Sequence, residues 1–269
     1  MSIDIFKQNK SLLMLAIDHR GSFQKILSPD NPNAVSAEDV ISTKKKIIDA
    51  LLPEFSGILI DPLYGLKAYP GKQKPFLLSI EKTGYEAQNE GRITELEYTV
   101  EELKGMGASG IKLLIYFNPT NQTAQQQLDT AKTVLEESHK HDLPLFLEIV
   151  TYDEGSAGKA DCIVKSVQMF LDHDIKADVF KLDYPENEQA CRQITQMLGS
   201  IPWILLTRGG TYEVFKQNLQ TAIANGAIGF LAGRSLWQEI GEHKNDADTY
   251  LQNTVLPRFK EICAVAKGA

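Results

Sequence analysis

Two lysines and a glutamate stand inside strongly apolar segments, where charged side chains are rare. Lys112 interrupts the run GIKLLIYF, Glu148 the run LPLFLEIV, and Lys181 the run DVFKLDY. A charge that is buried without a partner is costly, so each side chain needs an ion pair, water or a ligand. A lysine whose pKa is lowered by burial and by a nearby cation becomes a nucleophile toward a ketone. The pattern therefore predicts an imine-forming amine at Lys181.

Lys112 and Glu148 have the chemistry to support such an amine. We expect Lys112 to supply the nearby cation and Glu148 to act as the acid–base group. Carbinolamine formation, dehydration and carbon–carbon cleavage each move a proton, which one carboxyl group can transfer repeatedly. A purely structural pair, with Lys181 bridged to Asp183 or Glu148, is the alternative. A counter-ion role for Glu148 does not exclude a catalytic one.

Two loops in the last quarter of the chain predict an anion site. TRGG follows the seventh apolar run and AGRSLW includes the end of the eighth. In barrel enzymes these loops often hold a phosphate with backbone N–H groups and a short helix. Glycines let the backbone approach an anion closely, and arginines clamp its oxygens. The residues expected to contribute are Arg208, Gly209, Gly210, Gly233 and Arg234.

Eight short runs of apolar and branched residues provide the elements that must position these groups. Continuous apolar runs are typical of parallel strands that are buried on both faces. We predict strands at 11–18, 56–61, 75–81, 110–117, 143–150, 178–184, 202–207 and 228–233. Each strand has an ionisable group at or near its C-terminal end, the end where barrel enzymes place their active sites.

Most gaps between these strands have helical patterns. We predict helices at 37–52, 94–106, 123–139, 186–198 and 212–224, the first capped by Ser36 with Asp39 three residues on. The stretch 62–74 leaves room for only about one helical turn because it contains prolines and glycines. Eight strand–helix units favour a closed (β/α)₈ (TIM) barrel over a doubly wound open sheet, and no GxGxxG follows the first strand. We expect residues 1–269 to form a single catalytic domain.

Composition excludes several classes of function. A net charge of −7 argues against a broad nucleic-acid surface. No signal peptide is visible, and the apolar run 12–17 is too short to span a membrane. Three cysteines without a CxxC pair fit reduced thiols in the cytoplasm. Only His19 follows a predicted strand, so we expect no metal and no other cofactor.

The motifs AIDHRG, IKLLIYFNP, FLEIVTY, FKLDYP and GFLAGRSLW resemble, in the same order, segments of the tagatose-1,6-bisphosphate aldolase family, which includes sulfofructose-1-phosphate aldolases. The resemblance covers about residues 11–240. It implies a class I aldolase on a (β/α)₈ barrel, with Lys181 as the Schiff-base lysine, Glu148 as the acid–base group and Lys112 in support. By the same resemblance, Asp18 contacts substrate hydroxyls, and Arg20, Gly233 and Arg234 bind substrate.

The sequence departs from this family at two places that bear on the substrate. His19 stands where the family usually has glutamine, so we count it with the substrate-binding residues. The segment 207–210 contains an arginine where the family usually has serine, a small residue and glycine. We therefore predict cleavage of a ketose phosphate or a sulfosugar into two three-carbon units.

Three alternatives stay open at this point. A transaldolase would use the same imine chemistry and pass its three-carbon enamine to an acceptor aldehyde. A non-catalytic sugar-phosphate sensor would keep the anion loops but could dispense with Lys181 and Glu148. A homo-oligomer is compatible with the sequence.

Overall fold

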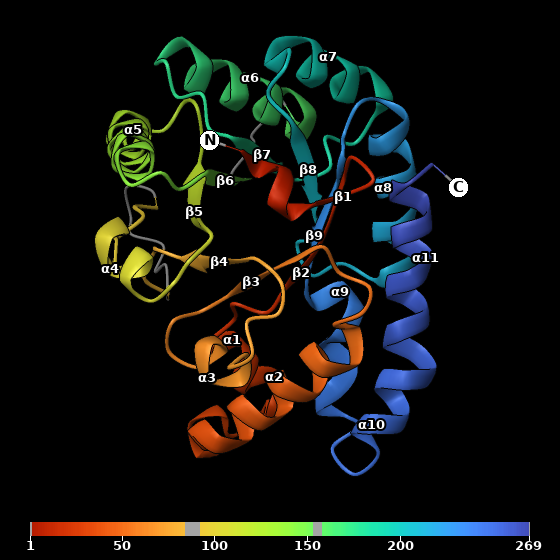
Figure 1. Cartoon of the computed structure of the whole chain (residues 1–269). Helices are drawn as coiled ribbons and strands as arrows, with labels where there is room; N and C mark the ends of the chain where they lie inside the picture. Colours follow the sequence, from red (N-terminus) through yellow and green to blue (C-terminus); the bar gives the residue numbers. More distant parts are fainter. Residues whose placement is uncertain (1, 84–91, 153–157, 269) are drawn as a thin grey trace.

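The computed structural model describes residues 2–83, 92–152 and 158–268 and shows a closed barrel of eight parallel strands surrounded by helices (Figure 1). The strands follow one another in chain order from β2 to β9, and β9 pairs with β2 to close the ring. The predicted (β/α)₈ barrel is therefore confirmed.

All eight predicted strands are present. They are β2 (Ser11–Ala16), β3 (Gly57–Ile60), β4 (Phe76–Ser79), β5 (Gly110–Phe117), β6 (Leu145–Thr151), β7 (Val179–Leu182), β8 (Trp203–Leu206) and β9 (Gly229–Ala232). Most of their residues are buried, because the lumen side chains cover one face of the sheet and the surrounding helices cover the other.

The helices are α1 (Gly21–Leu27), α2 (Ala37–Leu51), α3 (Gly65–Ala68), α4 (Val100–Gly105), α5 (Ala124–Lys140), α6 (Gly158–Asp172), α7 (Glu188–Leu198), α8 (Tyr212–Ala224), α9 (Arg234–Trp237), α10 (Ala247–Tyr250) and α11 (Leu256–Ala266). The capping box predicted for α2 is formed by Ser36 and Asp39. The single turn of α3 agrees with the short helix expected in 62–74. Among the described residues, no helix is long and apolar enough to cross a membrane.

One predicted helix was largely wrong. Residues 94–99 are not helical: Leu96 forms an antiparallel bridge to Glu81, residues 97–98 form a bend, and α4 begins only after Thr99. Thr94 is held to the barrel, because its hydroxyl donates to the carbonyl of Leu114 at 3.0 Å. The capping box formed by Thr99 and Glu102 is the sequence signal that marks the true start of the helix. Helix α6 and the C-terminal helix α11 were not predicted.

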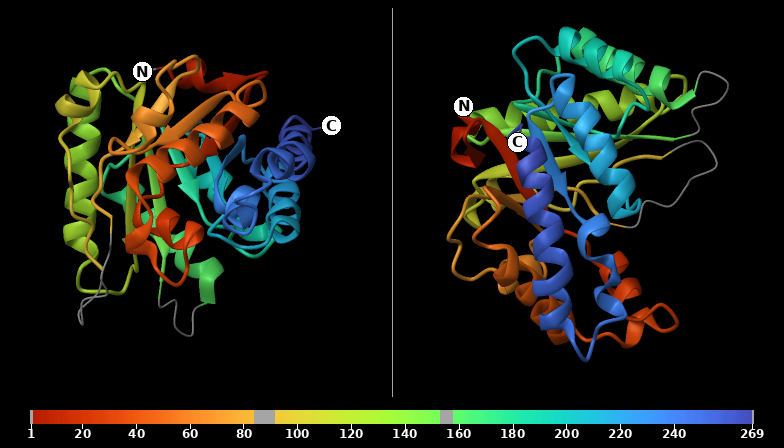
Figure 2. Two further views of the ribbon diagram at one scale, coloured as in Figure 1. Left: turned by 90° about the horizontal axis from the view of Figure 1, so that it is seen from below. Right: turned by 90° about the vertical axis from the view of Figure 1, so that its right-hand side faces the viewer.

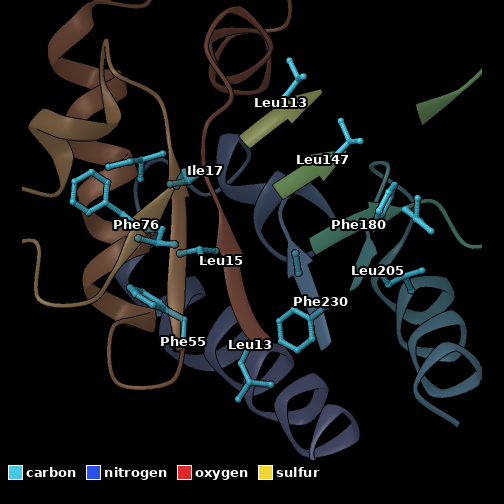
Figure 3. Packing of buried hydrophobic residues seen from close by; sticks show 14 of the residues in the cluster. Leu13, Leu15, Ile17, Phe55, Phe76, Leu113, Leu147, Phe180, Leu205 and Phe230 are labelled. Carbon is cyan, nitrogen blue, oxygen red and sulfur yellow. The ribbon is translucent and has the colours of Figure 1, made fainter. Parts of the chain in front are cut away.

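The outward-facing strand residues form the main core against the helices. Figure 3 shows part of this packing, in which alternate residues of one strand, such as Leu13, Leu15 and Ile17, point to the same side. The two-residue period of each strand therefore assigns every second side chain to the lumen.

The N-terminal segment fills one end of that lumen. It forms a 3₁₀ turn (Ile3–Phe6) and a short strand, β1 (Lys7–Gln8), antiparallel to β2, at one end of the barrel (Figure 2). Phe6 is fully buried and meets Phe146 edge-to-face, with 5.3 Å between the ring centroids. Gly57 makes room for it, since a Cβ there would lie 2.7 Å from a ring carbon of Phe6. We refer to this set as the apolar plug: Ile3, Phe6, Leu12, Met14, Ala16, Leu59, Leu77, Phe146, Val179, Ile204 and Leu231.

Candidate active site

Lys181 on β7, Glu148 on β6 and Lys112 on β5 meet inside the barrel, on three strands that lie side by side. Lys181 Nζ lies 2.9 Å from Glu148 Oε2, and Lys112 Nζ lies 3.0 Å from the same oxygen. Side-chain exposure is 8% or less for all three. The strand register explains the first contact, because Glu148 on β6 is directly paired with Lys181 on β7. The three residues singled out in the sequence thus form one contiguous group.

Two further carboxylates complete this group around Lys112. Glu81, which follows β4, places Oε1 2.5 Å from Lys112 Nζ, and Asp18, which follows β2, places Oδ2 at 3.2 Å. We refer to Asp18, Glu81, Lys112, Glu148 and Lys181 as the ion cluster. Sequence reasoning placed Glu81 at a strand end but gave it no role. The strand register explains its position beside Lys112, because Lys112 on β5 is paired with Ser79, two residues before Glu81.

Burial and the two ammonium groups act in opposite directions on the carboxylates. Burial alone would raise the pKa of Glu148, but Lys112 and Lys181 outweigh it and hold this pKa below its usual value. The pKa of Asp18 is likewise held well below its usual range, chiefly by Lys112 against the effect of burial. At Glu81 burial prevails over Lys112, and its pKa is raised. Glu148 is therefore ionised in this arrangement and can accept a proton.

His19 lies beside the ion cluster as a neutral imidazole. Burial and, to a smaller extent, nearby cations lower its pKa to about 3, although Asp18 opposes the shift. Its ring packs edge-on against Trp237, with 5.2 Å between the centroids. A neutral imidazole offers one donor and one acceptor, which suits hydroxyl groups of a sugar.

Arg20 is held away from open solvent by its own partners. It is 6% exposed, forms an ion pair with Glu97, and donates to the backbone carbonyl of Glu81 at 2.8 Å. These contacts tie the loop after β2 to the segment after β4. The substrate contact expected for Arg20 stays a prediction, and its visible role is to fix the backbone that carries Glu81.

The two glycine-containing loops lie against each other and against the loop after β2. Gly209 has a φ of +71°, and a Cβ there would lie 3.2 Å from the guanidinium carbon of Arg234. A Cβ on Gly233 would lie 3.2 Å from both the His19 ring and the carbonyl oxygen of Ala16. A side chain at Gly209 is therefore disfavoured by the left-handed backbone, and one at Gly233 would require its neighbours to shift.

Arg208 occupies the same region but is engaged differently. It donates to Asp183 at 2.9 Å and to the carbonyl oxygen of Thr151 at 2.7 Å, while its side chain stays 40% exposed. Its backbone is left-handed (φ 45°), and with Gly209 it forms a turn closed by a hydrogen bond from the Gly210 N–H to the Thr207 carbonyl. Arg208 thus links the loop after β8 to the ends of β6 and β7.

Not every ionisable residue at the end of a strand faces the mouth of the barrel. Asp61, which follows β3, is fully buried in an ion pair with Lys44 of α2 and accepts the backbone N–H of Tyr64 at 2.7 Å. Lys44 also donates to the carbonyl of Ile17 at 2.8 Å. This pair is structural, because it fastens α2 to the ends of β2 and β3.

The fold and the ion cluster together define a class of protein: a (β/α)₈ barrel with a buried lysine that shares a carboxylate with a second lysine at the catalytic end. Such an arrangement suits covalent amine chemistry on a carbonyl. Among the described residues, no group of three or more His, Cys, Asp and Glu side chains is arranged to hold a metal ion. That the enzyme needs no metal stays a prediction.

Comparison with known proteins identifies the family. A family model described as "DeoC/LacD family aldolase" matches residues 12–239, so the chain belongs to this family. A tagatose 1,6-diphosphate aldolase of Staphylococcus aureus (strain bovine RF122 / ET3-1) is 27% identical and covers 99% of this chain and 94% of its own length. Tagatose 1,6-diphosphate aldolase 1 of Streptococcus pyogenes serotype M3 is 29% identical, covering 83% of this chain and 79% of its own length.

Solved structures of aldolases share the fold. An archaeal fructose-1,6-bisphosphate aldolase with its catalytic lysine bound to the carbinolamine intermediate superposes with a TM-score of 0.72 at 18% identity, covering 99% of this chain and 98% of that one. A fructose-bisphosphate aldolase of Plasmodium falciparum gives a TM-score of 0.74 at 12% identity, covering 98% and 92% of the two chains. At these identities the similarity supports the barrel architecture.

Proposed function

We propose that this protein is a lysine-dependent (class I) aldolase that cleaves a ketose with a terminal phosphate or sulfonate into two three-carbon units. The observation that carries the proposal is the 2.9 Å contact between Lys181 Nζ and Glu148 Oε2, buried where barrel enzymes perform their chemistry. The named activity of the curated relatives, cleavage of tagatose 1,6-diphosphate, supports the same reaction type.

Each residue of the ion cluster can have a separate role in imine chemistry. Glu148, 2.9 Å from Lys181 Nζ, accepts a proton from the Lys181 ammonium, and the resulting amine attacks the ketose carbonyl. Glu148 then returns protons to the carbinolamine, whose hydroxyl leaves as water to give the iminium. The resulting iminium withdraws electrons when the carbon–carbon bond breaks. Lys112 keeps Asp18 and Glu148 ionised and in position, and Asp18 and His19 receive the sugar hydroxyls.

The loops after β8 and β9 supply the proposed anion site. Arg234, next to Gly209 and Gly233, is placed to bind a phosphate or sulfonate together with backbone N–H groups. Arg208 and Gly210 lie beside it and would complete the site once substrate enters. Either anion has tetrahedral oxygens that a guanidinium fork can bind, so both a ketose phosphate and a sulfosugar are candidate substrates.

Borohydride trapping tests the proposal directly. With a panel of ketose phosphates and sulfosugars, reduction should add one substrate-derived mass to the peptide that contains Lys181. No adduct with any ketose would contradict imine chemistry and favour a non-catalytic sugar-phosphate sensor. Adduct on Lys112 instead would show that the wrong lysine is named. Activity should also survive dialysis against EDTA, and a loss restored only by a divalent ion would contradict a class I mechanism.

Transaldolase activity is the second candidate, because Lys181 and Glu148 serve both reactions through the same enamine. Product analysis with and without added glyceraldehyde 3-phosphate separates the two: an aldolase releases the three-carbon ketone, whereas a transaldolase transfers it to the acceptor. We further propose that residues 1–269 act as one catalytic domain in the cytoplasm, either as a single chain or as a homo-oligomer.

A further inference from the structure

Glu81 is a buried member of the ion cluster to which the reaction steps above give no role. Its side chain follows β4 and is 4% exposed. Glu81 Oε1 lies 2.5 Å from Lys112 Nζ, and Oε2 accepts the backbone N–H of Leu114 at 3.2 Å. Both oxygens thus accept hydrogen bonds, as those of an ionised carboxylate do. Both donors belong to β5, so this carboxylate acts on the strand that carries Lys112.

The carboxylate of Glu81 takes the place of a backbone acceptor. The N–H of Ile80 donates to the carbonyl of Lys112 at 3.1 Å, and in a continued parallel ladder the carbonyl of Ile80 would accept the N–H of Leu114. That carbonyl instead accepts the N–H of Glu97 at 2.9 Å. The chain turns away from β5 at this point, and the Glu81 side chain bonds the N–H that the backbone leaves.

The backbone of Glu81 is fixed from two sides. Arg20 donates to its carbonyl oxygen at 2.8 Å, and Leu96 forms an antiparallel bridge to it. The next residue continues this bridge, since the N–H of Lys82 donates to the carbonyl of Glu95 at 2.8 Å. The carboxylate therefore has a defined position relative to β5, and Lys112 is held against a fixed anion.

The Lys112 ammonium has as many carboxylate partners as it has N–H donors, which is three. Glu81 is the nearest at 2.5 Å, followed by Glu148 at 3.0 Å and Asp18 at 3.2 Å. Glu148 uses the same oxygen, Oε2, for Lys112 and for Lys181, which is 2.9 Å away. Two ammonium groups thus compete for one oxygen, and Glu81 holds one of them from the side of β4.

We propose that Glu81 is a positioning residue, which holds Lys112 so that Glu148 Oε2 stays available to the proton of Lys181. This inference rests on the proposed aldolase function. Without the charge of Glu81, Lys112 would keep Asp18 and Glu148 as its carboxylate partners and move toward them. Glu148 would then be a weaker base toward Lys181, because a closer cation stabilises its ionised form. The amine that attacks the ketose would form more slowly.

Glu81→Gln tests this role, because the amide keeps the shape but loses the charge and one of the two acceptor oxygens. We expect kcat to fall about ten- to a hundredfold, as for other small displacements of catalytic groups. KM should stay within about twofold, since Glu81 acts through Lys112 and not on the ketose. The rate of borohydride trapping at Lys181 should fall with kcat. Tagatose 1,6-diphosphate, or the ketose of the panel that turns over fastest, serves as substrate.

The variant should fold, because it leaves two carboxylates facing two ammonium groups in the ion cluster. Denaturant unfolding checks this point. Glu81→Asp keeps the charge but is one methylene shorter, and we expect it to recover part of the lost kcat. If Glu81→Gln does not fold, the same separation of kcat from KM is measured in Glu81→Asp.

Glu95→Gln is the matched control. It removes a carboxylate from the segment that flanks Glu81, but Glu95 is 60% exposed and pairs with Lys82, so neither kcat nor KM should change. An unchanged kcat in Glu81→Gln, a rise in KM without a fall in kcat, or an equal loss in Glu95→Gln would overturn the role of Glu81. Absence of any trapped imine in the wild type would instead overturn the aldolase function itself.

Discussion

The two ends of the barrel lumen are built from the same strands but from opposite chemistry. On β6, Phe146 belongs to the apolar plug, while Glu148, two residues later, belongs to the ion cluster. On β7, Val179 and Lys181 are divided in the same way. At one end, the fully buried Phe6 excludes water; at the other, carboxylates and ammonium groups neutralise one another within 3.2 Å.

This difference separates stability from activity along each strand. Burying an aromatic ring stabilises the fold through its contact area, whereas a buried ion pair roughly offsets its own desolvation. The plug can therefore stabilise a lumen whose other end is charged and open to substrate. Substitutions in the apolar plug should accordingly change the free energy of unfolding, and substitutions in the ion cluster should change turnover.

The largest expected effect is at Lys181. Lys181→Arg keeps the charge but cannot form an imine, and Lys181→Met removes the charge while Glu148 keeps Lys112 at 3.0 Å. Both variants should fold with a free energy of unfolding near that of the wild type and lose essentially all turnover. Steady-state rates and denaturant unfolding measure the two quantities. Full activity in Lys181→Arg would contradict the imine mechanism.

The opposite result is expected at the plug. Phe6→Ala should lower the free energy of unfolding by about 3–5 kcal/mol, because a fully buried ring is lost beside Gly57 and Phe146. The kcat of the folded fraction should stay near the wild-type value. Ile5→Ala is the matched control, since Ile5 is 56% exposed and should change neither quantity. A selective loss of kcat in Phe6→Ala would break the separation between the two ends.

A smaller effect is expected in the anion loops. Arg234→Ala should raise KM about ten- to more than a hundredfold, because a charge-assisted hydrogen bond contributes about 1.5–3 kcal/mol. Arg208→Ala should give a smaller rise, since its side chain is 40% exposed and solvent screens the interaction. If KM is unchanged in both variants, the anion binds elsewhere.

The smallest effect concerns pH and His19. The folded protein keeps this imidazole neutral down to about pH 3, whereas the unfolded chain binds a proton below about 6.5. The unfolded state therefore binds more protons, and the free energy of unfolding falls as the pH drops below about 6.5. His19→Gln should remove this dependence, which is at most about 1.4 kcal/mol per pH unit. Unfolding curves at pH 7, 6 and 5 measure it, and equal slopes in the two proteins would contradict the buried neutral imidazole.

The strands were predictable because their signal is local. A strand covered on both faces must be a continuous apolar run, and all eight such runs became strands. The helix predicted at 94–106 was too long because Thr94 and Leu96 bond to residues that are distant in sequence. Thr94 donates to Leu114 and Leu96 pairs with Glu81, and only the folded barrel brings these partners together. The apolar plug could not be predicted for a related reason, because nothing in the sequence of residues 3–6 indicates that they enter the lumen.

For the candidate site, the sequence by itself determined which strands carry charged residues and on which face, because strand parity is fixed by the pleat. It thereby selected Lys181, Glu148 and Lys112. Only the tertiary structure decided how the charges pair: Glu81 with Lys112, Asp61 with Lys44, and Asp183 with Arg208. These partners lie 17 to 31 residues apart in the chain. Their contacts arise from barrel closure and helix packing, which no local pattern of residues encodes.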